Sequence, residues 1–230
     1  MTTRQAHREF KDRLYEQLAR LGKALSSPHR LEILELLAQG ERTVESLSTE
    51  MAMPVANISQ HLQALRHAAL VDSRKDGLFV HYRLADPYVF ELSKTIRMVA
   101  ERRLADFERL VKEHFGERSG AQPVAVDELV KLARSNKVVV LDTRPAGEYV
   151  AGHIPGAISV PVDEMQRRLK ELTKSKEYVA YCRGPYCIYA DRAVEVLRAR
   201  GRRARRLAEG FPEWRSAGFP VAQGTEPGVL

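Results

Sequence analysis

The stretch "SQHLQALRHAALVDSRKDGLFVHYRL" (residues 59–84) decides the fold predicted for the first half of this chain. Its first part places apolar residues three or four positions apart, which is the spacing of one buried helix face. Its second part consists of two alternating runs around Asp76-Gly77, a pair that favours a two-residue turn between antiparallel strands. A helix followed directly by a β-hairpin is therefore expected here.

Further helices are expected before this stretch. Apolar residues in 10–25 recur at steps of three and four, which predicts one helix with a single apolar stripe. Ser27 and Pro28 are typical of the N-cap and first residue of a second helix. Thr43 is expected to cap a short third helix, and Pro54 precedes the helix that enters the stretch quoted above.

Two domains are predicted. A mainly α-helical domain covers residues 1–115, and its last element, 87–115, is expected to be one long amphipathic helix. The remaining boundaries are a linker at 116–122, an α/β domain at 123–222 and a tail at 223–230.

The α/β domain is predicted from the alternation of strands and helices. "KVVVLD" (137–142) and "EYVAY" (177–181) are typical of buried strands. "DEMQRRLKEL" (163–172) and "IYADRAVEVLRARG" (188–201) are typical of amphipathic helices. This alternation indicates a mainly parallel central sheet.

Composition narrows the class of protein. The chain has 230 residues, of which 44% are hydrophobic and 29% charged, as in globular proteins. It has no apolar run long enough to cross a bilayer and no secretory signal, so a cytoplasmic location without a membrane partner is expected. The formal net charge of +7 indicates an acidic partner, although the basic run at 198–207 is more typical of a solvated surface.

The helix and hairpin of residues 55–84 have the polar surface of a DNA-binding module. Two short helices followed by a hairpin are the parts of a winged helix-turn-helix, whose second helix enters the major groove. Ile58, Leu62 and Leu65 are expected to anchor that helix in the core, while the polar side chains reach bases or phosphates. The candidate DNA-contacting residues are Asn57, Ser59, Gln60, His61, Gln63 and Arg66 on the helix, and Arg74, Lys75, His81 and Arg83 on the hairpin. For His61, which lies beside the apolar stripe, a buried histidine is an equal alternative.

The segment "SQHLQALRHAALV" and the basic hairpin ending in "YRL" resemble the ArsR-type family of bacterial winged-helix repressors. The resemblance extends over most of residues 10–115. It implies a homodimer, joined through its first and last helices, on double-stranded operator DNA of palindromic sequence. The soft-metal sites of metal-sensing members have no counterpart, because "VESLSTEMA" lacks cysteine and the last helix offers only the isolated His114. No metal site and no cofactor are expected.

Two motifs of the second domain resemble the rhodanese fold. "VVVLDTRPAGEYVAGHIPGAISVP" (138–161) is similar to its opening motif. "LAEGFPEWRSAGFPV" (207–221) is similar to its closing motif, with Glu209 where a glycine is usual. Asp142 and Arg144 are expected to support the loop that follows the first strand rather than to act chemically.

The only two cysteines of the chain, Cys182 and Cys187, lie together in "YCRGPYC", between a strand and a helix N-terminus. The inward N–H groups and the helix dipole of such a loop stabilise an anion, lower the pKa of a thiol and hold a persulfide. By resemblance to rhodaneses, Cys182 accepts a sulfane sulfur atom. The candidate cradle residues are Gly184, Tyr186 and Ile188. Phosphatase chemistry is disfavoured, because it would need an arginine at position 188.

Cys187 stands at the last loop position, where the family often has a cation that binds an anionic donor. We predict that Cys187 attacks a persulfide on Cys182, which releases sulfide and leaves a disulfide. The alternative is that Cys187 packs as a small apolar residue. Arg183 is expected to supply part of the missing positive charge and is the third catalytic candidate.

Three functions fit these features. The first is a transcriptional repressor whose rhodanese-like domain senses sulfane sulfur from a polysulfide, persulfide or thiosulfate. The second is a rhodanese-type sulfurtransferase whose DNA-binding module only localises or dimerises it, although the missing cation argues against efficient thiosulfate turnover. The third is a sensor in which the two thiols capture arsenite.

Overall fold

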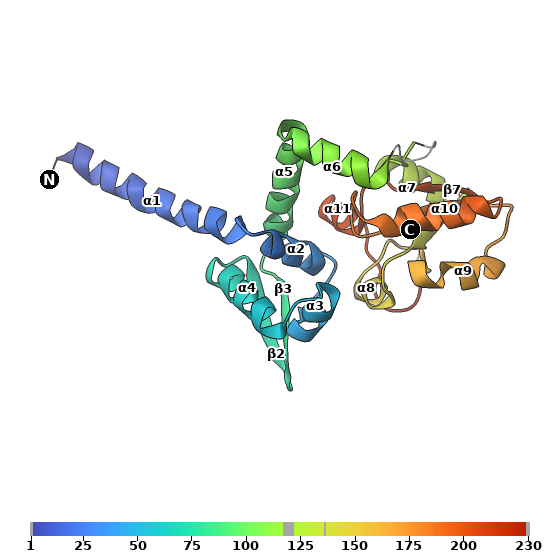
Figure 1. The fold of residues 1–230 in the computed structure, drawn as a ribbon, viewed down its shortest axis with the longest axis horizontal. Helices are drawn as coiled ribbons and strands as arrows, with labels where there is room; N and C mark the ends of the chain where they lie inside the picture. The colour runs from blue at the N-terminus through green and yellow to red at the C-terminus, as the bar shows by residue number, and fades with distance from the viewer. Residues whose placement is uncertain (1, 117–121, 136, 229–230) are drawn as a thin grey trace. The chain divides into compact units, whose positions relative to one another are not determined.

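The computed structural model describes residues 2–116, 122–135 and 137–228. It divides into two compact units, Met1–Ser93 and Lys94–Leu230 (Figure 1). The division falls inside helix α5 (Pro87–Arg103), so the end of this helix belongs to the second unit. The predicted linker at 116–122 lies mostly outside the described residues.

The first unit is mainly helical with one small antiparallel sheet. In Figure 1 its first helix extends away from the others, and its β-hairpin projects beyond them. The sheet has the strand order β1-β3-β2. The elements before α5 are α1 (Thr3–Leu25), α2 (Pro28–Leu37), β1 (Arg42–Thr43), α3 (Val44–Glu50), α4 (Val55–His67), β2 (Val71–Asp76) and β3 (Phe79–Leu84).

The hairpin confirms the predicted strands but moves the turn by one residue. Asp76 pairs with Phe79 in the sheet, so the turn residues are Gly77 and Leu78 rather than Asp76 and Gly77. Gly77 has a φ of +59°, which a glycine adopts without steric cost. The side chain of Leu78 at the tip is 97% exposed.

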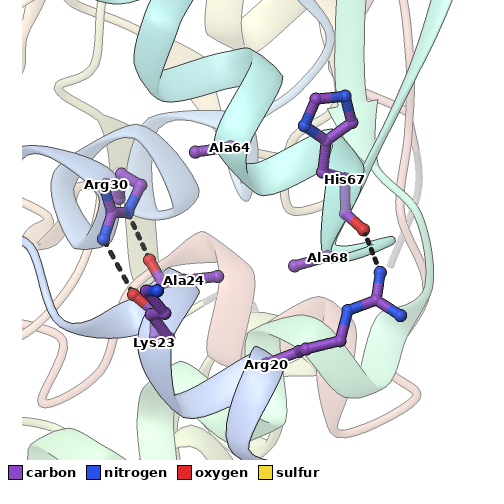
Figure 2. A pocket seen from close by; sticks show the side chains of 7 residues that line it. All are labelled: Arg20, Lys23, Ala24, Arg30, Ala64, His67 and Ala68. Carbon is purple, nitrogen blue, oxygen red and sulfur yellow. Dashed lines mark hydrogen bonds between the residues drawn. The ribbon is translucent and has the colours of Figure 1, made fainter. Parts of the chain in front are cut away.

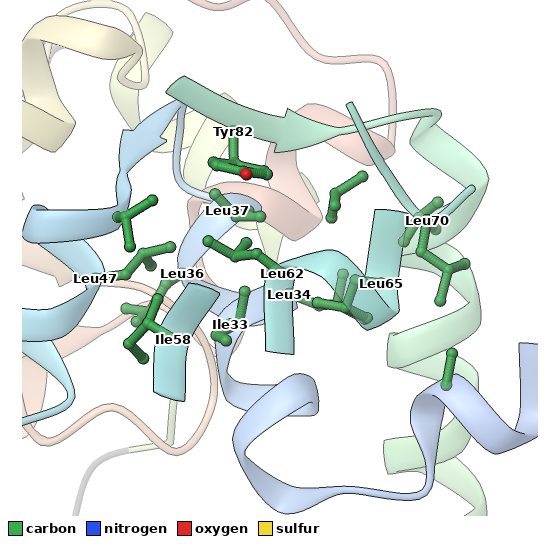
Figure 3. Close-up of a cluster of buried hydrophobic side chains, with 14 of the residues drawn as sticks. Ile33, Leu34, Leu36, Leu37, Leu47, Ile58, Leu62, Leu65, Leu70 and Tyr82 are labelled. Carbon is green, nitrogen blue, oxygen red and sulfur yellow. The ribbon is translucent and has the colours of Figure 1, made fainter. Parts of the chain in front are cut away.

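The core of the first unit confirms the predicted anchors of α4. Ile58, Leu62 and Leu65 are fully buried and pack with Ile33 and Leu34 of α2 (Figure 3). Burial of each such side chain contributes roughly 1.5–3 kcal/mol. The opposite face of α4 is thereby directed to the surface.

Two local predictions about helix starts have different outcomes. The Thr43 hydroxyl accepts a hydrogen bond from the Ser46 N–H at 3.2 Å, as expected for the cap of α3. Ser27 is the N-cap residue of α2, but its side chain makes no capping bond. The fixed φ of Pro28 is the feature that suits the start of this helix.

The predicted single helix over 87–115 is wrong. It is interrupted at Leu104, whose backbone is extended (φ −106°, ψ 104°), and α6 (Ala105–Phe115) begins there as a separate helix. Asp106 and Glu108 lie in the first turn of α6, where carboxylates are favourable at the positive end of the helix dipole.

The rest of the second unit is an α/β fold around a four-stranded sheet, which confirms the predicted parallel arrangement. The strand order is β5-β4-β6-β7, and every pairing is parallel. The strands are β4 (Val138–Asp142), β5 (Ile158–Ser159), β6 (Glu177–Tyr181) and β7 (Arg203–Arg206).

The helices of this unit depart from the prediction in three places. The expected helix at 163–172 is divided into α9 (Met165–Arg168) and two 3₁₀ turns, η1 (Val162–Glu164) and η2 (Leu169–Glu171). Helix α7, which precedes β4, and helix α8, which follows it, were not expected. The remaining helices are α7 (Val126–Arg134), α8 (Ala146–Ala151), α10 (Ile188–Ala199) and α11 (Phe211–Ser216).

The sheet places one loop at the junction of a strand end and a helix start. Strand β6 ends at Tyr181 and α10 begins at Ile188, so residues 182–187 connect them. The carboxyl ends of parallel strands are the usual position of ligand sites in open α/β sheets. Over the described part of the chain, no helix has the length and apolar character that crossing a bilayer requires.

Candidate functional site

Both cysteines lie in the dithiol loop, residues 182–187, as free thiols. Cys182 is 2% exposed, whereas Cys187 is half-buried at the N-cap of α10. The Cys182 Sγ donates to the carbonyl oxygens of Cys187 at 3.4 Å and of Gly184 at 3.7 Å. The first and last residues of this loop are therefore in contact.

The two thiols have opposite pKa shifts. Burial raises the pKa of Cys182 well above its ordinary value, and the hydrogen bond to Cys187 adds to this increase. A side-chain hydrogen bond that the Cys182 thiol donates to the Cys187 sulfur, helped by backbone N–H groups of Tyr189 and Arg183, lowers the pKa of Cys187 to about 7. The expected lowering at Cys182 is wrong, because desolvation outweighs the cradle there; the thiolate near neutral pH is Cys187.

Only one of the three residues predicted to surround the Cys182 sulfur, Gly184, donates a backbone hydrogen bond to it. Backbone N–H groups of Gly184 and Ala190 donate to the Cys182 sulfur. Ile188 is the first residue of α10, and the ring of Tyr186 packs on Phe107. Ala190 was missed, although it lies in the first turn of a helix, where N–H groups lack intrahelical acceptors.

The guanidinium of Arg183 is directed at Glu148. Its Nη2 lies 2.5 Å from Glu148 Oε1, and the two side chains are 10% and 5% exposed. An anionic sulfur donor would have to compete with this carboxylate for the charge of Arg183. The charge of Arg183 also helps to lower the pKa of Cys187, so Arg183 contributes positive charge to the loop while its guanidinium is bound to Glu148.

Asp142 and Arg144 form a fully buried ion pair behind the loop, with Arg144 Nη2 2.6 Å from Asp142 Oδ2. Arg144 also donates to the Gly152 carbonyl at 2.7 Å, and the Tyr181 hydroxyl donates to Asp142 at 2.6 Å. These contacts join the ends of β4 and β6, which agrees with a supporting role.

The candidate DNA-contacting residues of α4 lie on its outer face. Asn57, Gln60, Gln63 and Arg66 are exposed, while Ser59 and His61 are half-buried. The His61 ring lies 5.3 Å from the ring of His29. Burial, then the charges of His29 and Arg30, lower the pKa of His61, so a charged contact from it to phosphate is disfavoured.

The two arginines of the hairpin are paired with carboxylates. Arg74 lies 2.7 Å from Glu41 and 2.8 Å from Asp76, and Arg83 lies 3.5 Å from Asp72. His81 is 3.9 Å from Glu41, while Lys75 is exposed. Exposed pairs contribute only about 0–1 kcal/mol, so DNA phosphates can displace them. Sequence reasoning missed Glu41, which precedes β1 and reaches the hairpin through the sheet.

A basic pocket of the first unit lies where α1, α2 and α4 meet (Figure 2). Arg20 donates to the His67 carbonyl at 2.7 Å, and Arg30 donates to the carbonyls of Ala24 and Lys23. These arginines satisfy carbonyl groups at the C-terminal ends of α1 and α4. The contacts of Arg20 and Arg30 are therefore those of side chains that cap the C-terminal ends of helices. No cluster of three or more His, Cys, Asp or Glu side chains suited to a metal ion occurs among the described residues.

A winged helix-turn-helix unit and a parallel-sheet domain with a dithiol loop define a two-domain regulatory protein. The bacterial regulatory protein, arsR family, matches residues 27–73, and the rhodanese-like domain matches residues 125–217. The HTH-type transcriptional regulator Rv0324 of Mycobacterium tuberculosis is 43% identical over 94% of this chain and 94% of its own length. The chain belongs to the arsR family of regulatory proteins and carries a rhodanese-like domain after its helix-turn-helix.

Other relatives cover less than half of the chain. The uncharacterized HTH-type transcriptional regulator Rv0081 of M. tuberculosis is 40% identical over 40% of this chain and 82% of its own length. The solution structure of the homodimeric winged helix-turn-helix DNA-binding domain Mb0332 from Mycobacterium bovis is 40% identical. It covers 46% of this chain and 93% of that chain, with a TM-score of 0.40.

Proposed function

We propose that this protein is a transcriptional repressor that binds operator DNA as a homodimer and senses sulfane sulfur with its dithiol loop. The observation that carries the proposal is the contact between the only two cysteines of the chain, with Cys182 Sγ 3.4 Å from the Cys187 carbonyl. Two thiols in contact, one of them a thiolate near neutral pH, are suited to accept one sulfur atom and then to close a disulfide.

DNA binding is supported by the outer face of α4. Its exposed side chains include the amides of Asn57, Gln60 and Gln63, which are the groups that pair with adenine in the major groove. The hairpin beside it carries Lys75 and the displaceable ion pairs of Arg74 and Arg83. In a dimer, the two α4 helices would read half-sites about 10 base pairs apart.

Dimerisation is supported by apolar side chains on the surface of α1. Phe10, Leu14, Tyr15 and Leu18 are 45–61% exposed along this helix. A contiguous apolar surface of this kind favours burial against a second molecule, and twofold symmetry is the commonest solution. A second copy of the chain would cover these residues.

The first chemical step transfers one sulfur atom from a persulfide donor, R–S–SH. The Cys182 thiol gives its proton to the Cys187 thiolate and attacks the outer sulfur of the donor. The S–S bond of the donor breaks, Cys182 becomes a persulfide, and R–S⁻ leaves and takes the proton from Cys187. The pKa of about 7 makes Cys187 an effective proton acceptor at neutral pH.

The second step consumes the persulfide. The Cys187 thiolate attacks the Cys182 Sγ, the bond to the outer sulfur breaks, and HS⁻ leaves. The products are a Cys182–Cys187 disulfide and one sulfide, so the two thiols are oxidised and the sulfane sulfur is reduced. Each protein chain reacts once until a reductant restores its thiols.

A sulfurtransferase is the second candidate, favoured by the rhodanese-like match over residues 125–217. Such an enzyme would form thiocyanate from thiosulfate and cyanide over many cycles. The ion pair between Arg183 and Glu148 disfavours a dianionic donor, because the carboxylate repels it. One sulfide per chain supports the sensor, whereas steady thiocyanate production supports the enzyme.

Two experiments test the proposal. Selection from a random pool of DNA duplexes should enrich a palindromic site, and recovery of no preferred sequence would contradict the repressor. Intact mass after treatment with sodium polysulfide should show a disulfide in the wild type. Cys187→Ser should show added sulfur at a slower rate, because this variant lacks the proton acceptor for Cys182. Cys182→Ser should retain no sulfur, and equal sulfur uptake by this variant would contradict the role of Cys182.

A further inference from the structure

The end of helix α5, which belongs to the second unit, contacts a buried carboxylate of α11 in the same unit. Arg97 Nη2 lies 2.6 Å from Glu213 Oε1 of α11, and the Glu213 side chain is 1% exposed. Removal of the cation would leave a buried charge without its partner, which is strongly unfavourable. This ion pair therefore holds the end of α5 against α11.

Glu213 is connected in turn to the dithiol loop. Its Oε2 accepts the Gly210 N–H at 3.0 Å, and the Phe211 N–H donates to the Cys182 carbonyl at 3.0 Å. A Cβ at Gly210 would lie 2.6 Å from the carbonyl oxygen of Arg183, so this backbone is packed directly on the loop. A displacement of the loop must move residues 210–213.

Helix α6 contacts the same loop through aromatic rings. The Tyr186 ring packs edge-on to Phe107, with centroids 5.4 Å apart, and lies 6.4 Å from the ring of Phe115. Aromatic pairs at these separations contribute beyond the area that they bury. Among the described residues, the loop is thus connected to α5 through residues 210–213 and contacts α6 through Tyr186.

We propose that the Arg97–Glu213 ion pair and the Tyr186–Phe107 contact transmit the sulfur state of the dithiol loop to α5 and α6. Cys182 is 2% exposed in a close-packed core, so an added sulfur atom or a closed disulfide displaces its neighbours. This inference rests on the proposed function, in which the loop accepts sulfur and the dimer binds DNA.

Helices α5 and α6 carry exposed apolar side chains, and a movement of these helices would change the surface that the side chains form. Val99 of α5, Leu104, and Leu110 of α6 are 55–63% exposed, so a second copy of the chain can cover them. A change in the direction of α5 or α6 would alter that surface, and with it the spacing of the two α4 helices on DNA. The contacts therefore act as a regulatory connection between sulfur chemistry and operator affinity.

The test uses the full chain and two uncoupled variants. Arg97→Gln combined with Glu213→Gln removes both charges, so no buried charge is left without a partner, and Phe107→Ala removes the ring that Tyr186 contacts. Arg109→Gln is the matched control, because the ion pairs of Arg109 with Asp106 and Glu113 are exposed. Intact mass measures sulfur uptake from sodium polysulfide, and fluorescence anisotropy measures affinity for the selected duplex.

The uncoupled variants should take up sulfur as the wild type does and bind DNA in the reduced state within about twofold of it. Their sulfur-induced change in Kd should be smaller by about fivefold or more, within the usual range of allosteric coupling. The Arg109→Gln control should respond fully. A full response in both uncoupled variants would overturn the inference and leave the proposed function intact.

Hydrogen exchange provides a readout that does not depend on DNA. Amides of residues 97–103 should change their exchange rate when wild-type protein is treated with polysulfide, and should not change in the Arg97→Gln, Glu213→Gln variant. If the amides of residues 97–103 exchange at the same rate in sulfur-loaded and untreated wild-type protein, the proposed transmission from the dithiol loop to α5 is wrong. Altered exchange without any change in operator affinity would instead count against the proposed function.

Discussion

The thiol of Cys182 and the backbone carbonyl of Cys187 lie 3.4 Å apart, at the two ends of one loop. A side-chain hydrogen bond between the two thiols raises the pKa of Cys182, which burial also raises, and lowers the pKa of Cys187. The buried residue stays a thiol and its neighbour becomes the thiolate.

This relationship predicts the pH dependence of alkylation. The pKa of Cys187 is lowered to about 7, so its thiolate is populated above this pH and lost below it. Iodoacetamide should modify Cys187 with a midpoint near pH 7, and Cys182 should react more slowly throughout. Cys182→Ala removes the hydrogen-bond donor, so the midpoint should rise toward about 8.5, the value of an ordinary thiol. Peptide mass mapping against pH measures both, and preferential modification of Cys182 would contradict the assignment.

The DNA-contacting face predicts two kinds of variant. Gln63→Ala should cost about 1–3 kcal/mol of operator binding and relax specificity at one base pair, because an amide no longer reads a base edge. Lys75→Ala should weaken binding to all sequences and reduce the salt slope by about 1, because one phosphate contact is lost.

The matched control for these variants is Lys170→Ala, which removes an exposed lysine from the second unit. Its operator affinity and salt slope should equal those of the wild type. A loss for Lys170→Ala as large as that for Lys75→Ala would show that affinity follows net charge rather than the hairpin.

The buried ion pair predicts a large loss of stability. Arg144→Met leaves Asp142 buried without its cation and should lower the free energy of unfolding by about 3–5 kcal/mol. Arg167→Met breaks an exposed pair with Glu164 and should cost about 0–1 kcal/mol. Fluorescence of Trp214, the only tryptophan and fully buried, reports urea unfolding of this unit. If Arg144→Met and Arg167→Met unfold at the same urea concentration, the predicted difference in stability is wrong.

The core of the first unit predicts another contrast. Leu62→Ala removes a fully buried side chain of α4 and should destabilise this unit by about 2–5 kcal/mol. Leu78→Ala, at the exposed hairpin tip, should change stability by less than about 0.5 kcal/mol. Calorimetry of the two variants measures the difference, and equal melting temperatures would argue against the core assignment.

Periodicity predicted most of the fold because it reports which side chains are buried. Ile58, Leu62 and Leu65 follow helical spacing and are buried, and the apolar run at 138–142 is a central strand. The break at Leu104 was not predicted, because an extended residue within an amphipathic pattern leaves the spacing on each side unchanged. The register of the hairpin turn was also missed by one residue, since Asp76 can occupy either a strand end or a turn.

The site was predicted less completely than the fold. Sequence placed both cysteines in one loop, but their ionisation depends on burial, which spacing does not give. Likewise, Glu148 is 35 residues from its partner Arg183, and Arg97 is 116 residues from Glu213. Such pairs arise only when the chain has folded, so no local pattern indicates them.

The most direct measurement of the central claim is operator affinity before and after sulfur loading of the same protein. Anisotropy titrations of the wild type with the selected duplex should show a change in Kd of about 5- to 150-fold after polysulfide, reversed by dithiothreitol. Cys182→Ser should show no change. An unchanged Kd in wild-type protein whose mass proves a persulfide on Cys182 or a Cys182–Cys187 disulfide would contradict the account.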